Sequence, residues 1–383
     1  MKTLIVYHAG AMKNPRQIYE ALAQTGDLEL TIVVAQRLKV ERVYDPSGWL
    51  IVEKEEGSNG YRLVPVPLKN PSAYWQGFES VPLRRLIKET QPDIIHVLDE
   101  PTSGTLFQIA WQRLRISRHS KVLFYGFQNL PVRLRRRGRL KWKLTWAQLA
   151  GGATANSEAL ENLKHAGFPK DRLLERIFWG ISLGVFKPME SSVLRRQLGL
   201  DCDYIVGYVG RMIPEKGVMV LLDSMRNLPA NVHCLFIGSG PLRAELEERS
   251  ESPDYRGRIH LYDVMEPEPL AEYMNCMDVL VLPSVSMPTW KEQYGRVIAE
   301  AMGCGVPVVG SDSGAISEVV GSAGLIVPEG DASALAEAVS TGIFDKEVRN
   351  RLKEQGLERA ERELSVAAMS ERLLSFYGRV LEA

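Results

Sequence analysis

The sequence is poor in cysteine and has no long apolar run. Its four cysteines, at positions 202, 234, 276 and 304, form no Cys-x-x-Cys pair, which argues against a disulfide framework or a zinc site and favours a reduced cytoplasmic compartment. No apolar stretch approaches the ~20 residues that a membrane-spanning helix needs. The opening "MKTLIVYHAG" lacks the long apolar stretch of a secretion signal, so we expect a first β-strand there.

Acidic residues are absent from one long segment. Between Pro101 and Ser157 there is no Asp or Glu, but there are 11 Lys and Arg residues. The net charge of the chain is zero, yet residues 1–190 hold 28 basic against 18 acidic residues, and residues 191–383 hold 19 against 29. This asymmetry indicates two units with different partners.

Internal repeats and low-complexity tracts are also missing, and short β-branched apolar runs alternate with helical patterns instead. In the first half the expected strands are "TLIVYH", "LTIVVA", "DIIHVL", "KVLFYG" and "ATAN". In the second half they are "YIVGYVG", "HCLFIG", "RIHLY", "VLVLPS", "PVVGS" and "GLIVP". Nearly continuous apolar strands are typical of parallel sheets covered on both faces. The pattern predicts two doubly wound α/β domains, with a break in the Gly-, Pro- and Ser-containing stretch 180–192.

Ligands of such folds collect beyond the carboxyl ends of the strands, so the residues there are the candidate site. After the strand in "YIVGYVGRMIPEKG" come Gly210, Arg211 and Lys216, which offer a guanidinium and an ammonium near the start of a helix. Two surface charges, with Glu215 as a partner of the lysine, are an equally good interpretation of this loop alone. The turn "GSGP", which contains Gly238, is a weak signal because the third glycine of a dinucleotide motif is absent.

Two glutamates flank a predicted helix from Tyr294 to Met302. Glu292 precedes this helix, and Glu300 lies two turns inside it. Eight helical residues would span roughly 12 Å, which is too far for a hydrolytic carboxylate pair but suits an elongated ligand held at two points. Two solvated charges are the alternative. The following turn, "SDSGAISEVV", places Gly314, Ala315 and Ile316 at another helix start that suits an anion.

Several of these strings closely resemble the family-4 retaining glycosyltransferases, which have the GT-B fold. The resemblance is strong over 205–330, in "GYVGRMIPEKG", "IGSGPLRAEL", "KEQYGRVIAEAMGCGVPVVGSDSGAISEVVG" and "AGLIVPEGD", and weaker over 1–150, in "QPDIIHVLDEP" and "ATANSEAL". It implies two Rossmann-like domains facing a central cleft. Residues 1–185 would bind the acceptor and residues 186–364 the nucleotide sugar, and the last helix, 365–383, would pack back on the first domain.

The resemblance also implies roles for individual residues. Arg211 and Lys216 would bind the donor diphosphate, Glu300 the ribose and Glu292 the donor sugar, while catalysis would rest on Glu292, Arg211 and Lys216. The further donor-site residues would be Gly10, Gly210, Gly238, Gly314, Ala315 and Ile316. The expected reaction is a metal-independent transfer of a hexose with retention, from a nucleotide-diphosphate sugar to a glycan, lipid-linked or other glycosyl acceptor. No cofactor is expected.

Two departures from the family pattern concern the first domain. Only Gly10 stands where many relatives have paired glycines, and "FYGFQNLP" lacks the histidine that many relatives have after this strand. The acceptor-side candidates are therefore His96, Asp99, Glu100, Gln128 and Asn129, although a satisfied, partly buried histidine is the preferred interpretation of His96. The string "DCD" at 201–203 resembles a metal-binding motif, but it precedes a strand, and we expect no metal there.

The acid-free segment contains "PVRLRRRGRLKWKLTWAQLAGG", with Trp142 and Trp146 on one helical side. A basic helix with tryptophans over 131–150 is typical of a surface for anionic lipids. Packing of the same side on its own sheet is an equally good interpretation, and nucleic acid is a weaker one. We therefore expect a cytoplasmic protein, with peripheral binding to the inner face of the membrane as an option. A sugar-nucleotide binder without turnover, or another GT-B enzyme such as an epimerase, is the alternative function.

Overall fold

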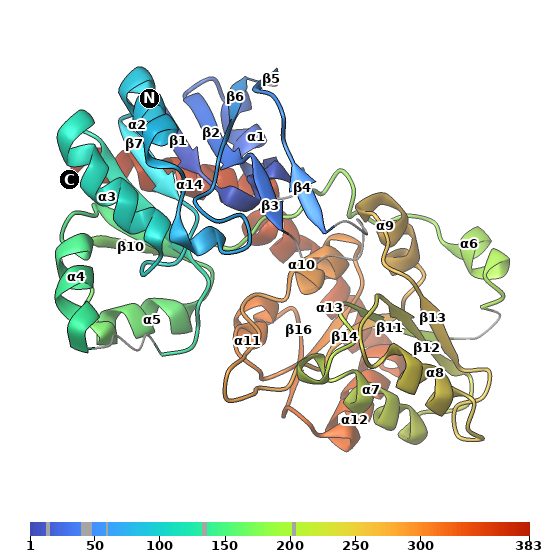
Figure 1. Ribbon diagram of the computed structural model, residues 1–383. Helices are drawn as coiled ribbons and strands as arrows, with labels where there is room; N and C mark the ends of the chain where they lie inside the picture. Colours follow the sequence, from blue (N-terminus) through green and yellow to red (C-terminus); the bar gives the residue numbers. More distant parts are fainter. Residues whose placement is uncertain (13–15, 40–47, 59, 132–135, 201–203) are drawn as a thin grey trace. The chain divides into compact units, whose positions relative to one another are not determined.

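The computed structural model describes residues 1–12, 16–39, 48–58, 60–131, 136–200 and 204–383 (Figure 1). The chain divides into two compact units. Unit 1 comprises Met1–Phe178 and Met369–Ala383, and unit 2 comprises Trp179–Ala368. Each unit has a parallel sheet and a hydrophobic core of its own, so the two doubly wound domains expected from the sequence are confirmed.

The division between the units lies a few residues from the predicted boundaries, 185/186 and 364/365. The segment after Phe178 belongs to unit 2 because it is bonded there. The Tyr294 hydroxyl donates to the Trp179 carbonyl over 2.6 Å, and Ile181 forms a parallel bridge with Ser365. These two contacts hold residues 179–181 to the rest of unit 2.

Unit 1 is built on a sheet with the strand order β10-β9-β8-β7-β1-β2-β6-β5. Its strands are β1 (Lys2–Val6), β2 (Glu29–Ala35), β5 (Glu56–Ser58), β6 (Tyr61–Val66), β7 (Ile94–Val97), β8 (Lys121–Gly126), β9 (Gly151–Thr154) and β10 (Leu173–Arg176). All pairs are parallel except β5 with β6. A separate antiparallel pair joins β3 (Arg37–Lys39) and β4 (Trp49–Ile51). The five predicted strands of this half are confirmed.

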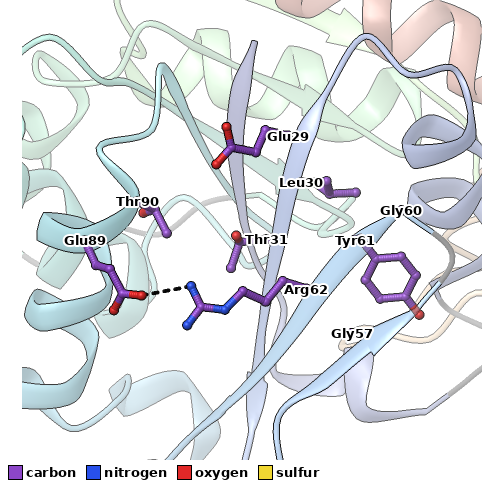
Figure 2. A pocket seen from close by; sticks show the side chains of 9 residues that line it. All are labelled: Glu29, Leu30, Thr31, Gly57, Gly60, Tyr61, Arg62, Glu89 and Thr90. Carbon is purple, nitrogen blue, oxygen red and sulfur yellow. Dashed lines mark hydrogen bonds and ion pairs between the residues drawn. The ribbon is translucent and has the colours of Figure 1, made fainter.

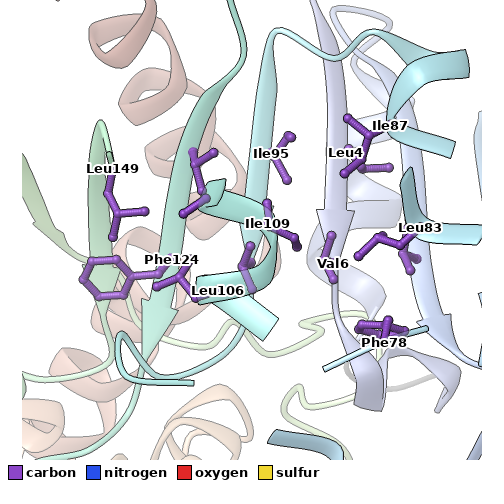
Figure 3. Close-up of a cluster of buried hydrophobic side chains, with 14 of the residues drawn as sticks. Leu4, Val6, Phe78, Leu83, Ile87, Ile95, Leu106, Ile109, Phe124 and Leu149 are labelled. Atoms are coloured by element: carbon purple, nitrogen blue, oxygen red, sulfur yellow. The ribbon is translucent and has the colours of Figure 1, made fainter. Parts of the chain in front are cut away.

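Helices cover both faces of the unit 1 sheet because its strands are apolar on both sides. Leu4 and Val6 of β1 face one core with side chains of α2 (Ser80–Thr90) and α3 (Gly104–Ile116) (Figure 3). The helices α4 (Arg136–Trp146) and α5 (Ser157–Ala166) add Trp146 and Leu163 to the same core. The other face is covered by α1 (Gln17–Gln24) and α14 (Val366–Glu382), which meet where the Ser370 hydroxyl donates to the Ile18 carbonyl. The last helix thus packs in unit 1.

Strand β6 is the main element of this sheet that the sequence pattern did not reveal. It reads "YRLVPV", and its proline interrupts the apolar run. A proline has no N–H for a ladder, so it is tolerated only where a strand is unpaired on one side. Strand β5 pairs with β6 only from Tyr61 to Leu63, which leaves Pro65 at such an edge.

Unit 2 has an all-parallel sheet with the strand order β13-β12-β11-β14-β15-β16. Its strands are β11 (Tyr204–Val209), β12 (Val232–Ile237), β13 (Ile259–Tyr262), β14 (Val279–Leu282), β15 (Val308–Ser311) and β16 (Gly324–Val327). The six strands predicted for this half are confirmed. Strand β11 lies between β12 and β14, so the order of connection reverses there, which is where ligands of open α/β sheets bind.

The unit 2 core packs Val206 of β11 and Phe236 of β12 against α7 (Val218–Ser224), α8 (Arg243–Ser250) and α12 (Ala332–Phe344). The remaining helices of this unit are α6 (Ser192–Gln197), α9 (Pro267–Asn275), α10 (Arg296–Gly303), α11 (Ile316–Val320) and α13 (Lys346–Arg359). Helix α10 starts two residues later than predicted, because Gly295 adopts a left-handed conformation, with φ 75°, and ends the preceding loop.

Candidate functional site

The carboxyl edge of the unit 2 sheet carries several of the donor-site residues predicted from the sequence. Arg211 follows β11 and is exposed, and a short 3-10 turn, Pro214–Lys216, leads from it into α7. The next strand in space, β14, is followed by Ser284, and the loop after it carries Glu292. Because β11 and β14 are neighbours in the sheet, these two loops meet at the point of reversal.

Lys216 and Glu292 form an ion pair at this point. The Lys216 Nζ atom lies 2.5 Å from Glu292 Oε2, and the Ser284 hydroxyl donates to the same oxygen over 3.0 Å. Only 15% of the Lys216 side chain and 8% of the Glu292 side chain are exposed, so water screens the pair weakly. The sequence suggested Glu215 as the partner of Lys216, but it is the Glu215 carbonyl that is engaged, by the Val285 N–H.

Glycines bring the backbone of these loops close together. Gly217 has φ +67°, and a Cβ atom added there would lie 1.8 Å from the Pro283 carbonyl oxygen. Gly238, in the "GSGP" turn, has φ +144°, and its added Cβ would lie 1.9 Å from the Gly210 carbonyl oxygen. The "GSGP" glycine therefore packs against the loop that bears Arg211. Only glycine fits either position.

Glu300 lies in α10 and has a different partner. Its carboxylate is 8% exposed, and Arg296 Nε lies 2.8 Å from its Oε1 atom. Burial raises the pKa of the Glu300 carboxyl, and the adjacent Arg296 guanidinium opposes that shift. Glu292 and Glu300 are thus two separately paired, mostly buried carboxylates, which excludes the alternative of two solvated helix charges.

The turn before α11 contacts Glu292 through its backbone. The Ala315 N–H donates to the Glu292 carbonyl over 2.9 Å, and the Ile316 N–H donates to the Ser313 carbonyl over 3.3 Å. These two N–H groups, predicted to meet sugar or phosphate, therefore hold the Glu292 loop and the turn in place. Gly314, with φ +53°, lies immediately before Ala315 in this turn.

Sequence reasoning missed a group of hydroxyls and one acid at the same edge. The Ser286 and Ser313 hydroxyls lie 2.9 Å apart, and the Ser286 N–H donates to Glu329 Oε2 over 2.8 Å. Ser286 follows β14, Ser313 follows β15 and Glu329 follows β16, so each stands beyond the carboxyl end of its strand. Position after a strand was the available signal, but serines in loops are too common to stand out.

The carboxyl edge of unit 1 brings together most of the acceptor-side candidates. Glu100 lies three residues beyond the end of β7. Its Oε1 atom accepts hydrogen bonds from the N–H groups of Phe127, over 2.8 Å, and Gln128, over 3.1 Å. Burial raises the pKa of Glu100 to about 7 and that of Asp99 to about 6. Asn129 is buried and Gln128 is exposed. Two acids that change charge near neutral pH therefore stand beside the loop that lacks the family's histidine.

Gly10 and His96 lie in packed surroundings of unit 1. Gly10 is buried in the turn after β1, where an added Cβ would lie 3.0 Å from the Tyr7 ring. His96 is fully buried, and its Nδ1 atom lies 2.7 Å from the Tyr377 hydroxyl of α14. Burial lowers the pKa of His96 to about 3, which keeps its ring neutral. The sequence favoured a partly buried histidine with its hydrogen bonds satisfied; His96 is instead fully buried, and its Nε2 atom has no hydrogen-bond partner among the described residues.

The tryptophans of the basic segment pack inward. Trp146 is fully buried and donates from its indole to the Pro101 carbonyl over 2.8 Å, and Trp142 packs against the same core. The side of α4 that remains outside carries Leu140 and Leu144, 68% and 47% exposed, beside Lys141 and Lys143. Residues 132–135, which belong to the proposed membrane surface, lie outside the described residues, as does the "DCD" string.

A pocket also opens at the opposite, amino edge of the unit 1 sheet (Figure 2). It is lined by the starts of β2 and β6 and the end of α2, and Arg62 reaches across it to Glu89 over 3.0 Å. None of the residues predicted from the sequence lines this pocket. It lies at the wrong end of the parallel strands for a Rossmann-like site.

Among the described residues, no three His, Cys, Asp or Glu side chains cluster in a way that could hold a metal ion. No helix within the same part of the chain is both long and apolar enough to cross a bilayer.

Comparison with known proteins shows relatives by sequence over half of the chain. Residues 203–344 match the family model described as "Glycosyl transferases group 1". The chain is 33% identical to the capsular polysaccharide biosynthesis glycosyltransferase CapM of Staphylococcus aureus over 48% of each chain. It is 30% identical to the alpha-D-kanosaminyltransferase of Streptomyces kanamyceticus, over 49% of this chain and 48% of that one. The chain therefore spans about half the length of the curated relatives it matches.

Solved structures extend the similarity to the whole fold. HepE of Anabaena, in complex with UDP, superimposes with a TM-score of 0.75 at 17% identity, over 99% of this chain and 100% of that one. The sucrose-phosphate synthase of Thermosynechococcus elongatus gives a TM-score of 0.73 at 21% identity, over 100% and 99%. At these identities the likeness concerns the fold, which is that of the GT-B proteins.

Proposed function

We propose that this chain, which carries a group 1 glycosyltransferase domain at 203–344 on a GT-B fold, is a glycosyltransferase that uses a nucleotide-diphosphate sugar. The observation that carries the proposal is the Lys216–Glu292 pair at the point where the unit 2 sheet reverses. A buried ammonium there suits a diphosphate, and a buried carboxylate beside it suits sugar hydroxyls. The relatives, which include sugar transferases and a UDP complex, support the same ligand class.

The donor is proposed to open the ion pair as it binds. The diphosphate would take Lys216 together with the exposed Arg211, and Glu292 would turn its carboxylate to the sugar while Ser284 holds one of its oxygens. As the glycosidic bond breaks, negative charge grows on the leaving diphosphate. The mostly buried Lys216 and the exposed Arg211 would stabilise that charge, which lowers the barrier. Glu300 is proposed to hold the ribose.

We propose that transfer retains the anomeric configuration and needs no metal or cofactor, with a hexose as the donor sugar. The family resemblance supports retention, and the two cations supply the charge that a metal would otherwise provide. The leaving diphosphate is proposed to take the proton of the acceptor hydroxyl. The acceptor is proposed to be a glycan, a lipid-linked saccharide or another glycosyl compound.

Donor binding tests this proposal directly. Titration calorimetry with UDP-, GDP- and ADP-glucose should identify one nucleotide that binds. Lys216→Ala should weaken that binding at least about tenfold, because it removes a charge-assisted contact. Glu300→Ala should weaken it too, whereas Lys346→Ala, an exposed lysine of α13, should not.

If the Lys216→Ala and Lys346→Ala variants bind the nucleotide with equal affinity, the nucleotide is not bound at this edge of the sheet. Transfer is read separately, as nucleotide released on addition of an acceptor. A protein that binds the nucleotide tightly but releases none with any acceptor would be a sugar-nucleotide binder without turnover.

The outer side of α4 is proposed to contact anionic lipid, in a protein of the cytoplasm. Leu140 and Leu144 stand one helical turn apart and are exposed, with Lys141 and Lys143 beside them. Apolar residues flanked by cations suit the boundary between headgroups and acyl chains. This surface differs from the tryptophan stripe expected from the sequence, because both tryptophans face the core.

A further inference from the structure

An aromatic pair stands in the loop between β6 and α2. Tyr74 and Trp75 begin a 3-10 turn, Tyr74–Gln76, and are 38% and 53% exposed. Their ring centroids lie 5.5 Å apart at an interplanar angle of 80°, so they form the two walls of a corner. Aromatic side chains of this size are usually covered, and an exposed pair points to a ligand or partner.

The loop that carries this pair is fixed to α3 by close backbone contacts. A Cβ atom added at Gly104 would lie 2.7 Å from the Trp75 carbonyl oxygen. The Gln108 side chain donates to the Phe78 carbonyl over 2.9 Å and accepts the Phe78 N–H over 3.2 Å. On the other side, the Tyr74 ring stacks on the His8 ring, with centroids 4.0 Å apart. The pair is therefore held in place before any ligand arrives.

Two carboxylates flank the same corner. The Tyr74 ring stacks on His8, and His8 and Asp99 each lie two residues beyond Val6 and Val97, which are paired in the neighbouring strands β1 and β7. Burial, and after it the charges of Asp99 and Glu100, raise the pKa of Tyr74. Asp99 is only 9% exposed; its Oδ1 atom accepts the Glu100 N–H over 2.9 Å. Burial raises the pKa of Asp99 to about 6, against hydrogen bonds from the Glu100 N–H and from the Thr105 and Ser103 side chains, which hold its carboxylate at the start of α3.

We propose that Tyr74, Trp75 and Asp99 form an acceptor subsite for a sugar ring that carries no negative charge. The inference rests on the proposed transferase function and names its acceptor class. A pyranose ring has a face of C–H groups, which packs on an indole, and an edge of hydroxyls, which donate to a carboxylate. Above about pH 7, where both carboxyls are ionised, Asp99 and Glu100 would repel a uronic acid or a sugar phosphate at this position, whereas a neutral or amino sugar meets no such repulsion.

The test separates the corner from the donor site. Acceptor kinetics and direct binding are measured with methyl α-glucoside, glucosamine and glucuronic acid as probes. Trp75→Ala should raise the KM for the accepted sugar about tenfold, while Trp75→Phe, which keeps a ring, should stay within about threefold of the parent. Trp111→Ala, another partly exposed tryptophan of unit 1, is the matched control and should change nothing.

Asp99→Asn gives a second, independent readout. It removes the negative charge and keeps the side-chain shape, so it should narrow the preference for the uncharged or amino sugar over glucuronic acid. The inference is overturned if Trp75→Ala binds the probes as the parent does, or if the parent takes glucuronic acid as readily as the other two. If the inference is overturned but every variant still binds the nucleotide, the proposed function is unaffected. A parent protein that binds no nucleotide sugar overturns the proposed function instead.

Discussion

At the scale of single residues, burial decides which acids and bases can change charge near neutral pH. Glu100 is held under the loop that follows β8, and burial raises its pKa from 4.5 to about 7. His96 and His8 are shifted the other way, to about 3 and about 4, because burial disfavours the charged ring. Only Asp99 and Glu100 of this group are therefore able to titrate in the range where the protein is expected to work.

The shift of Glu100 makes stability depend on pH with a definite sign. Below pH 4.5 the carboxyl is protonated in both states and contributes nothing. Between that value and about 7 it ionises only in the unfolded chain, so the folded state loses stability as the pH rises. Above about 7 the loss is constant. From about pH 5.5 to about pH 8 the loss is on the order of 2 kcal/mol.

Glu100→Gln should abolish this contribution. The free energy of unfolding of the variant, relative to the parent, should rise by about 2 kcal/mol between pH 5.5 and pH 8, because the amide carries no charge in either state. Urea titrations at the two pH values measure it, and taking the difference between the proteins cancels the opposite contributions of His8 and His96. The exposed Glu79→Gln serves as control. A parent–variant difference that is the same at both pH values would contradict the shift.

At the scale of elements, a glycine determines how closely the loops that follow β11 and β14 approach each other. The 3-10 turn Pro214–Lys216 ends at Gly217, whose backbone lies against the carbonyl that follows β14. This approach lets Lys216 of one loop reach Glu292 of the other. The spacing of the two loops therefore depends on a position that bears no functional side chain.

Replacing each of two glycines with alanine distinguishes the effect of this close approach from the effect of backbone strain. Gly217→Ala and Gly257→Ala both put a side chain at positive φ, +67° and +77°, which costs about 1–2 kcal/mol. Gly257 has nothing within 4 Å of the added Cβ, whereas Gly217 has a carbonyl oxygen at 1.8 Å. Gly217→Ala should therefore cost about 1–3 kcal/mol more in urea unfolding and weaken nucleotide binding as well. Equal costs, with nucleotide binding unchanged, would show that the loops can separate freely.

The sequence predicted some strands and helices better than others. The eleven expected strands are present, and most of them are nearly continuous apolar runs, a local pattern that the sequence shows directly. Strand β6 was missed because a proline can sit in a strand only when the far side is unpaired, and pairing is not visible in one chain segment. The start of α10 was misplaced because Gly295, at positive φ, reads as an ordinary helical glycine in the sequence.

At the scale of the whole molecule, charge is separated along the chain although its net value is zero. Residues 1–190 carry 28 basic and 18 acidic residues, and residues 191–383 carry 19 and 29. The acid-free segment 101–157 contains all of α4, whose outer side carries Leu140 and Leu144. Such a molecule can be attracted to an anionic surface through one part while remaining neutral overall.

Vesicle co-sedimentation tests this attraction. The protein should bind vesicles rich in phosphatidylglycerol, bind phosphatidylcholine vesicles poorly, and be released by salt, which screens the lysines. Leu140→Gln with Leu144→Gln should lower the bound fraction about tenfold, through loss of buried apolar area. Val193→Gln, on α6 of unit 2 and 55% exposed, should have no effect. Binding that is insensitive to both salt and the leucines would place the contact elsewhere or exclude it.

The sequence by itself determined the two Rossmann-like halves and the strands at which ligands can collect, and it predicted Arg211, Lys216 and Glu292 in loops and Glu300 in a helix as site residues. It could do so because strand periodicity and residues after strand ends are local properties of the chain. Tertiary structure alone decided that Lys216 pairs with Glu292 rather than Glu215, that the α4 tryptophans face inward, and that Tyr74 stacks on His8 and forms a corner with Trp75. The physical reason is that partners, burial and the resulting pKa values depend on segments far apart in the chain, which only packing brings together.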